Sequence, residues 1–108
     1  MEKTISEEIA ERYPRLELKS RLHFCNDYTY YSYLKKMFVY QDKRVMRCEK
    51  EYIDCIHLNV VFQYKYGKSF KKGKEKEKAL FLALVQAYVD LIDVYNLMAD
   101  CELHKDVY

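Results

Sequence analysis

Tryptophan is absent from this 108-residue sequence, and proline and glycine are scarce, with one and two residues respectively. So few turn-forming residues argue against a many-stranded barrel or sandwich and favour a small number of long elements. Half of the residues are apolar, which is enough for one hydrophobic core at this length. We therefore expect a single domain that covers residues 1–108.

A large charge of one sign is also missing, since the formal net charge is +2. Non-specific binding of nucleic acid by the whole molecule is therefore not expected. Residues 1–14 are charged and contain no apolar stretch of the kind found in secretory signals. The longest apolar run, residues 79–99, carries Asp90 and Asp93, whose charges would be costly in lipid, so we expect no membrane span.

These absences indicate a cytoplasmic protein. Its four cysteines are then expected to be reduced. A hyperthermophilic source would reverse this expectation, because disulfides are common inside such cells.

The N-terminal part of the chain predicts a short helix. Thr4-x-x-Glu7 is a capping-box pattern in front of a helix-forming stretch at residues 7–12, and Pro14 ends that stretch. Apolar residues at 16–24 loosely follow the two-residue period of a strand.

A second helix is predicted over residues 28–40, behind the N-cap candidates Asn26 and Asp27, because its apolar residues recur at helical spacing. The polar segment 41–44 predicts a loop. Residues 45–48 then have the character of the start of a strand.

The clearest strand signal lies at residues 56–66. Apolar residues occupy every second position of this segment, and mostly polar residues fill the positions between them. The pattern predicts a well-paired strand that ends at Gly67 and turns Leu58, Val60 and Phe62 toward the helices.

A long C-terminal helix is predicted over residues 75–98, where apolar residues cover most of the circumference. The order of elements predicts an α+β protein of the two-layer αββα type, with a small antiparallel sheet packed against helices. One apolar stripe of the long helix can pack on the sheet, and the other needs cover from another helix or a second chain. We expect a homodimer that forms through Tyr88, Val89, Ile92 and Tyr95.

Four segments follow one another in an order that is typical of a known family: IAERYPRL, CNDYTYYSYLKKMF, IDCIHLNVVFQYKYGKS and KALFLALVQAYVDL. Their order and apolar pattern resemble the small phage proteins grouped as the phage ABA-sandwich domain, over residues 7–92. The resemblance implies a two-layer αββα fold and a phage or prophage origin. It implies no catalytic residues.

Two cysteine–histidine pairs, His23-x-Cys25 and Cys55-x-His57, are candidate metal ligands. In strands, residues i and i+2 share a face, so the two pairs together would form a tetrahedral Cys2His2 set. Structural zinc sites usually use CxxC or HxxxH spacings, which are absent, and cysteine often serves as a small buried apolar residue. We therefore expect no metal and no other cofactor.

No set of residues has a spacing that indicates catalysis. The segment YGKS at 66–69 resembles the end of a P-loop but lacks the first glycine of that motif. Cys55 and His57 have no third group to orient them. Asp90 and Asp93 share a helix face, where carboxylates are ordinarily solvated. An enzyme is therefore disfavoured.

Residues 65–78 contain seven lysines against Glu75 and Glu77. Such a run is ordinarily a solvated connector. As a functional surface it would bind a nucleotide or nucleic acid, with phosphates held by lysines and bases stacked on aromatic rings. The candidate binding residues are Lys65, Lys68, Lys71, Lys72, Lys74, Tyr64, Tyr66 and Phe70.

The favoured function is that of a non-enzymatic accessory protein of phage or prophage type, which acts by binding a host protein or ligand in the host cytoplasm. Host-defence inhibition is one such role, and it rests on the resemblance alone. The alternatives are a nucleotide- or nucleic-acid-binding module that uses residues 65–78, and a small metal-dependent enzyme.

Overall fold

The structure, a computed structural model, describes the backbone of residues 2–107 and the side chains of residues 2–101. Its elements are α1 (Ile5–Arg12), the 3₁₀ turn η1 (Arg21–His23), α2 (Asp27–Tyr66) and α3 (Lys71–Val107). No strand occurs among the described residues. The predicted α+β fold of the αββα type, with its small antiparallel sheet, is therefore wrong, and the chain is helical.

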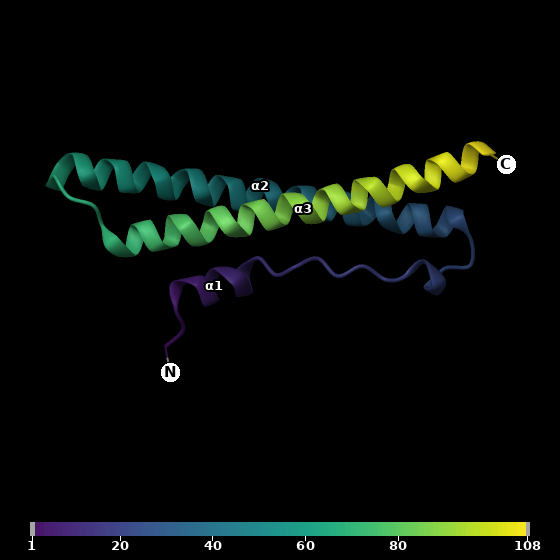
Figure 1. Cartoon of the computed structure of the whole chain (residues 1–108), viewed down its shortest axis with the longest axis horizontal. Helices are drawn as coiled ribbons and strands as arrows, with labels where there is room; N and C mark the ends of the chain where they lie inside the picture. The colour runs from purple at the N-terminus through teal and green to yellow at the C-terminus, as the bar shows by residue number, and fades with distance from the viewer. Residues whose placement is uncertain (1, 108) are drawn as a thin grey trace.

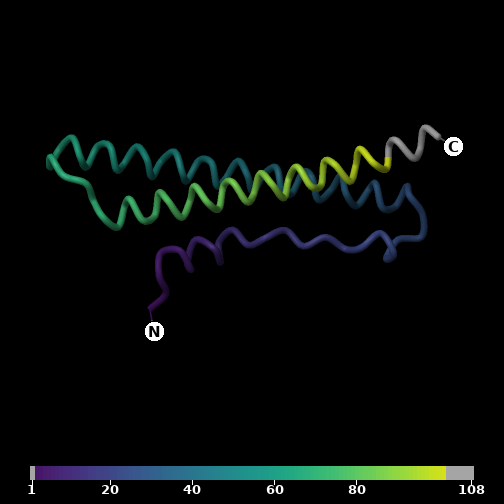
Figure 2. Tube along the Cα trace, viewed as in Figure 1, coloured from purple at the N-terminus to yellow at the C-terminus, as the bar shows by residue number. Residues whose placement is uncertain are grey.

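Helices α2 and α3 form an antiparallel hairpin, joined by a short loop at residues 67–70 (Figure 1). The molecule is elongated, with extents of 64 × 32 × 14 Å. Its radius of gyration is 18.6 Å, whereas a compact chain of this length has roughly 13 Å. Residues 2–26, which we call the N-terminal arm, run along the hairpin from near its loop to the start of α2 (Figure 2).

The hairpin is held together by buried residues that recur every seven positions on each helix. This interval is the repeat of a coiled coil, in which it keeps one seam of a helix facing its partner over many turns. The buried residues at this interval are Leu34, Gln41, Cys48 and Cys55 on α2 and Gly73, Leu80, Ala87 and Val94 on α3.

The apolar core lies in two clusters at different levels of the hairpin. Near the loop, Ile9 of α1 packs with Cys55 and Leu80. Toward the other end, Leu34 and Val94 form a second cluster with Tyr30, and residues of the extended part of the arm pack against it. The N-terminal arm therefore fills one groove of the hairpin with apolar side chains.

The helix ends follow the capping signals in the sequence. The side chain of Thr4 accepts a hydrogen bond from the Glu7 backbone N–H at 3.1 Å, and Asn26 Oδ1 accepts one from the Thr29 N–H at 2.9 Å. Gly67 adopts a left-handed conformation with φ 67°, which ends α2. The capping signals predicted at Thr4 and Asn26 are thus confirmed, whereas Gly67 ends a helix where the sequence predicted the end of a strand.

Three predictions for the segments between the helix ends are wrong. The loop expected at 41–44 is helical, and Gln41 and Arg44 are buried within it. The strand start expected at 45–48 is also helical. The extended residues before η1 form no strand, so the strand expected at 16–24 is wrong as well.

The strand predicted at 56–66 is the last part of α2, and its expected inward face is wrong. Leu58 and Val60 are exposed, while the polar Asn59 is buried. Helical geometry brings residues three or four apart to one face, so Cys55, Asn59 and Phe62 share the side that faces α3. The polar Asn59 lies on the inner side of the helix and the apolar Val60 on its outer side. Together with their neighbours they give the alternation of apolar and polar residues that is typical of a strand.

Glu51 on α2 fixes α1 to the hairpin. The Arg12 guanidinium and the Tyr13 hydroxyl both donate to its carboxylate, and Lys76 Nζ lies 3.9 Å away. Burial alone would raise the pKa of Glu51, but the hydrogen bonds from Tyr13 and Arg12 and the charges of Arg12 and Lys76 outweigh it. The pKa of Glu51 therefore lies below its usual range.

Glu51→Gln should lower the free energy of unfolding at pH 7 by about 1 kcal/mol or less, since the ion pair is partly solvated. A carboxyl whose pKa is depressed by folding stabilises above its unfolded pKa of about 4.3, and this contribution is lost as the pH falls. Thermal melts should therefore separate wild type from variant at pH 7 and superimpose at about pH 2. A gap of equal size at both pH values would contradict this role.

Candidate interaction surfaces

One side of the hairpin carries uncovered apolar side chains, and we call it the open face. On α3, the N-terminal arm packs at Ala79 and Ala83 and bonds Asp90. Positions two residues away are turned by about 200° and point to the opposite side. The open face consists of Val39, Met46, Ile53 and Val60 of α2 and Phe81, Val85, Tyr88, Ile92 and Tyr95 of α3, all exposed.

The spacing within the open face is that of a second helix–helix seam. Its α2 residues recur every seven positions, and its α3 residues alternate between steps of four and three. Both intervals place side chains on one stripe of a helix. Each long helix therefore has a buried stripe that packs inside the hairpin and an apolar stripe that no other described residue covers.

The α2 and α3 parts of the open face lie side by side. The Tyr88 hydroxyl of α3 donates to Glu49 Oε2 of α2 at 2.6 Å, and this bond raises the pKa of Tyr88. The rings of Tyr52 and Phe81 lie 5.9 Å apart between centroids. The α3 stripe thus borders α2 at Glu49, which lines one hollow together with Met46 and Ile53.

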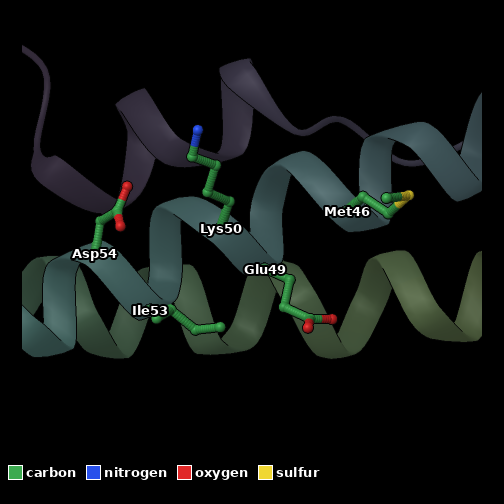
Figure 3. A pocket seen from close by; sticks show the side chains of 5 residues that line it. All are labelled: Met46, Glu49, Lys50, Ile53 and Asp54. Carbon is green, nitrogen blue, oxygen red and sulfur yellow. The ribbon is translucent and has the colours of Figure 1, made fainter.

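The hollow on this surface is shallow. It measures about 250 Å³, and Met46, Glu49, Lys50, Ile53 and Asp54 line it. Figure 3 shows that all five side chains come from α2, with Glu49 pointing over α3 and Lys50 pointing toward α1. A hollow lined by one helix suits a side chain of a partner rather than an enclosed small molecule.

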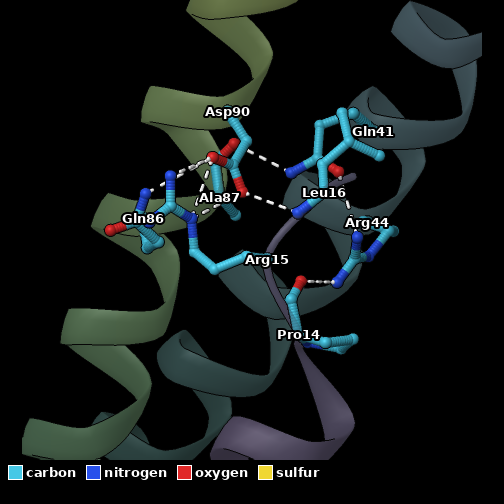
Figure 4. A network of polar contacts seen from close by, with 8 residues as sticks. All are labelled: Pro14, Arg15, Leu16, Gln41, Arg44, Gln86, Ala87 and Asp90. Atoms are coloured by element: carbon cyan, nitrogen blue, oxygen red, sulfur yellow. Dashed lines mark hydrogen bonds and ion pairs between the residues drawn. The ribbon is translucent and has the colours of Figure 1, made fainter. Parts of the chain in front are cut away.

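On the opposite side, Asp90 ties the N-terminal arm to α3 (Figure 4). Only 4% of its surface is exposed. Its carboxylate accepts hydrogen bonds from the Arg15 side chain at 3.0 and 3.1 Å and from the Leu16 backbone N–H at 3.0 Å. Asp93, three residues further along α3, is exposed. Asp90 therefore has a structural role, because it holds the N-terminal arm against α3.

Two buried polar residues of α2 extend this layer. Gln41 Nε2 donates to the Ala87 carbonyl at 3.0 Å, and Arg44 donates to Gln41 Oε1 at 3.2 Å and to the Pro14 carbonyl. Among the described residues, no buried side-chain nitrogen or oxygen lacks a hydrogen-bond partner. This layer needs no ligand to complete it.

The lysine-rich segment lies around the loop of the hairpin, and we call this region the basic tip. Of its seven lysines, Lys74 pairs with Glu77 and Lys76 with Glu51, each at 3.9 Å. The other five form no ion pair with any described side chain. They are Lys65, Lys68, Lys71, Lys72 and Lys78.

Aromatic rings stand among these lysines. Tyr66 and Phe70 pack against Phe62, with centroids 4.7 and 5.0 Å apart, and both remain exposed. Tyr64 is 90% exposed. The structure thus brings the predicted anion-binding residues together at one end of the molecule.

The close contact of α2 with α3 near the basic tip depends on Gly73. Asn59 Nδ2 donates to the Gly73 carbonyl at 2.9 Å and to Glu77 at 3.2 Å. A Cβ at position 73 would lie 2.1 Å from Asn59 Oδ1. The conformation of the basic tip is therefore fixed by contacts within the chain.

The two cysteine–histidine pairs do not meet. Cys25 precedes α2 and Cys55 lies about 30 residues along it, which at ~1.5 Å per residue separates them by about 40 Å. In a helix, residues i and i+2 point in nearly opposite directions, and accordingly Cys55 is buried while His57 is exposed. No group of three or more His, Cys, Asp or Glu side chains gathers among the described residues.

The nucleophile and P-loop interpretations lack their geometry as well. The Cys55 thiol lies 3.6 Å from the Gly73 carbonyl, and burial raises its pKa. Burial likewise raises the pKa of Cys48 to about 11. Gly67 and the YGKS segment form a helix C-cap and a loop between antiparallel helices, whereas a P-loop links a strand to a helix.

Comparisons with known proteins return no match: no family model, no curated protein and no solved structure is similar to this chain. The αββα fold implied by the phage ABA-sandwich resemblance is not the fold found here. A phage or prophage origin stays a hypothesis.

One helix is long and apolar enough to cross a membrane, judged by length and composition alone. It is the Lys71–Cys101 part of α3, whose mean hydropathy reaches 1.4 over 18 residues, with 22% of that window buried inside the molecule. The expectation that no membrane is involved stays a prediction.

Sequence reasoning missed the α2 part of the open face: it assigned Val39, Met46 and Ile53 to no surface and expected Val60 to face inward. It also missed the buried polar residues Gln41 and Arg44, which it assigned to a loop. The seven-residue interval on α2 is the signal that identifies both groups, because polar residues on a continuous helix can occupy a seam.

Proposed function

We propose that this chain is a non-enzymatic binding protein that assembles as a two-fold dimer through its open face. The observation that carries the proposal is the amount of surface left uncovered. The chain exposes 8485 Å², whereas a compact monomer of 13.2 kDa exposes roughly 6,400 Å². The difference, about 2,000 Å², exceeds the roughly 800 Å² per partner of a standard protein interface.

A second copy of the chain fits the open face better than lipid does. Two hairpins that pair through such faces form a four-helix bundle, in which apolar stripes at coiled-coil spacing interlock. Helices that lie on membranes instead carry Lys and Arg on their polar face. Between Ala79 and Cys101, α3 contains no basic residue, and Asp90, Asp93 and Asp100 are its charged residues.

The exposed positions of the predicted dimer residues support this proposal. Tyr88, Ile92 and Tyr95 lie on the open face, and Val89 is exposed beside it. A two-fold axis would bring the same face of each chain together. In such a dimer each α3 stripe would be buried together with the α2 stripe beside it.

Ile92→Lys and Ile53→Lys should each weaken dimerisation by about 100-fold or more, since each places a charge in the middle of an apolar interface. Leu22→Lys is the matched control, because Leu22 is also apolar and exposed but lies on η1, away from the hairpin face. Sedimentation equilibrium should give twice 13.2 kDa for wild type and control, and 13.2 kDa for the two variants.

A wild-type chain that remains monomeric at about 100 µM, well above the Kd of most specific complexes, would overturn the proposal. A monomer that binds phospholipid vesicles through Ile92 would assign the open face to lipid instead.

A further inference from the structure

The basic tip combines positive charge with exposed aromatic rings, a combination that the proposed dimer does not use. The tip stands at the end of the hairpin, whereas the middle of the open face lies along its length (Figure 1). Each tip is formed by one chain. Its function can therefore be tested in a monomer.

Charge at the tip is concentrated although the whole chain is nearly neutral. Residues 65–78 contain seven lysines and two glutamates, against a net charge of +2 for the protein. Five of these lysines have no ion-pair partner among the described side chains. Their ammonium groups remain free to neutralise the phosphates of a ligand.

The first turn of α3 carries Lys71, Lys72 and Lys74 and contains no acidic residue. Cations near a helix N-terminus oppose the helix dipole, and α1 follows the usual preference with Glu7 and Glu8 in its first turn. An anion bound beside these lysines would remove the repulsion. The arrangement is therefore unfavourable to the free helix and suited to a polyanion.

The aromatic rings distinguish a nucleic acid from other polyanions. Tyr66 and Phe70 are exposed and pack on Phe62, which holds their rings in place, whereas Tyr64, two residues before Tyr66 on α2, points to the other side of the helix. Exposed rings among cationic side chains offer a platform on which unpaired bases stack. The carboxylate side chains of an acidic peptide and the headgroup of phosphatidylserine carry no planar aromatic ring that could stack on this platform.

We infer that the basic tip binds single-stranded nucleic acid, through lysine contacts to phosphates and base stacking on Tyr66 and Phe70. For single strands, the logarithm of the binding constant falls with the logarithm of the salt concentration, with a slope of about −0.7 per neutralised phosphate. Five lysine contacts therefore predict that the affinity falls by about 100-fold between 50 and 200 mM salt. Sequence preference should be weak, since every base has a face that can stack.

The test is fluorescence anisotropy of a labelled 12-nucleotide oligothymidylate titrated with the protein, carried out on wild type and on the Ile92→Lys monomer. The triple variant Lys68→Gln, Lys71→Gln and Lys72→Gln, which removes three of the five unpaired lysines, should reduce the salt slope by about 2. Glutamine keeps the helix propensity of lysine, so α3 should be retained. The matched control replaces Lys19, Lys36 and Lys43, which are exposed elsewhere, with glutamine and should change neither slope nor affinity.

Stacking is tested separately with Tyr66→Ala, which should weaken oligothymidylate binding by about 5- to 100-fold. Tyr28→Ala is its control, because Tyr28 is 75% exposed on the same helix but lies at the far end from the tip. Circular dichroism should show that both variants keep the helical spectrum of wild type.

Binding of the protein to heparin and to phosphatidylserine vesicles distinguishes recognition of nucleic acid from binding to any polyanion. Wild-type protein that binds heparin as tightly as oligothymidylate, with no loss of oligothymidylate affinity in Tyr66→Ala, would overturn the inference and leave a non-specific cationic surface. Vesicle binding without oligothymidylate binding would also overturn it. Binding of the oligonucleotide by the Ile92→Lys monomer would show that the tip acts whether or not the chain dimerises.

Discussion

Val94→Asp should abolish cooperative folding, whereas Val60→Asp should melt within a few degrees of the parent protein. Val94 is 0% exposed and packs with Tyr30 and Leu34 between the helices. A carboxylate placed there without a partner costs several kcal/mol, a large fraction of the total stability of a domain of this size. Val60 is 60% exposed on the open face, so its replacement leaves the inside of the hairpin unchanged.

Both substitutions change the same residue type in the same way, so they differ only in position. They are best made in the Ile92→Lys background, so that loss of dimerisation adds nothing to either melt. Far-UV circular dichroism should show a helical spectrum with a cooperative transition for Val60→Asp and a largely unfolded chain for Val94→Asp. An unfolded Val60→Asp variant would mean that Val60 is buried, as the strand predicted at 56–66 requires, and would contradict the exposed position of Val60 on the hairpin.

Local signals at the helix ends could be predicted from the sequence because they depend on few residues. Thr4, Asn26 and Gly67 each cap a helix through a side chain or a backbone conformation that the residue itself determines. The scarcity of Gly and Pro also predicted long elements correctly. From Arg15 to Tyr66 the chain contains neither residue, which is consistent with one helix of 40 residues in that region.

The interior of α2 could not be predicted by hydrophobic period, because its seam contains polar residues. Gln41, Arg44 and Asn59 are buried there, and each is satisfied by a partner distant in sequence, such as the Ala87 and Pro14 carbonyls. Without knowledge of these partners, a buried glutamine looks like a loop residue. The partners exist only once α3 and the arm pack against α2.

The candidate surfaces were predictable to different degrees for the same reason. The residues of the basic tip are contiguous in sequence, so a single loop brings them together. Helical spacing placed the predicted dimer residues of α3 on two neighbouring apolar stripes of that helix. Their α2 counterparts Met46 and Ile53 come from a segment that had been divided between a loop and strands, and so the face appeared half as wide.

Asp90→Ala should lower the free energy of unfolding by about 2–3 kcal/mol and release the N-terminal arm from the hairpin. The substitution removes a buried acceptor that binds the Arg15 side chain and the Leu16 N–H. Arg15→Met should cost less, about 1 kcal/mol, because the Arg15 side chain is 62% exposed and its ion pair is screened by water. Asp90→Asn should fall between the two, since an amide oxygen still accepts from Leu16.

Denaturant unfolding measures the free energy of unfolding of each variant. Limited trypsin digestion measures how accessible the N-terminal arm is, because its cleavage sites include Arg15 and Lys19. Cleavage in the arm should accelerate most in Asp90→Ala, while α2 and α3 resist for longer. Asp93→Ala is the matched control, because this aspartate is exposed three residues away, and it should change stability by less than about 0.5 kcal/mol. Equal losses from Asp90→Ala and Asp93→Ala would mean that apolar packing alone holds the arm, with no measurable contribution from the polar layer.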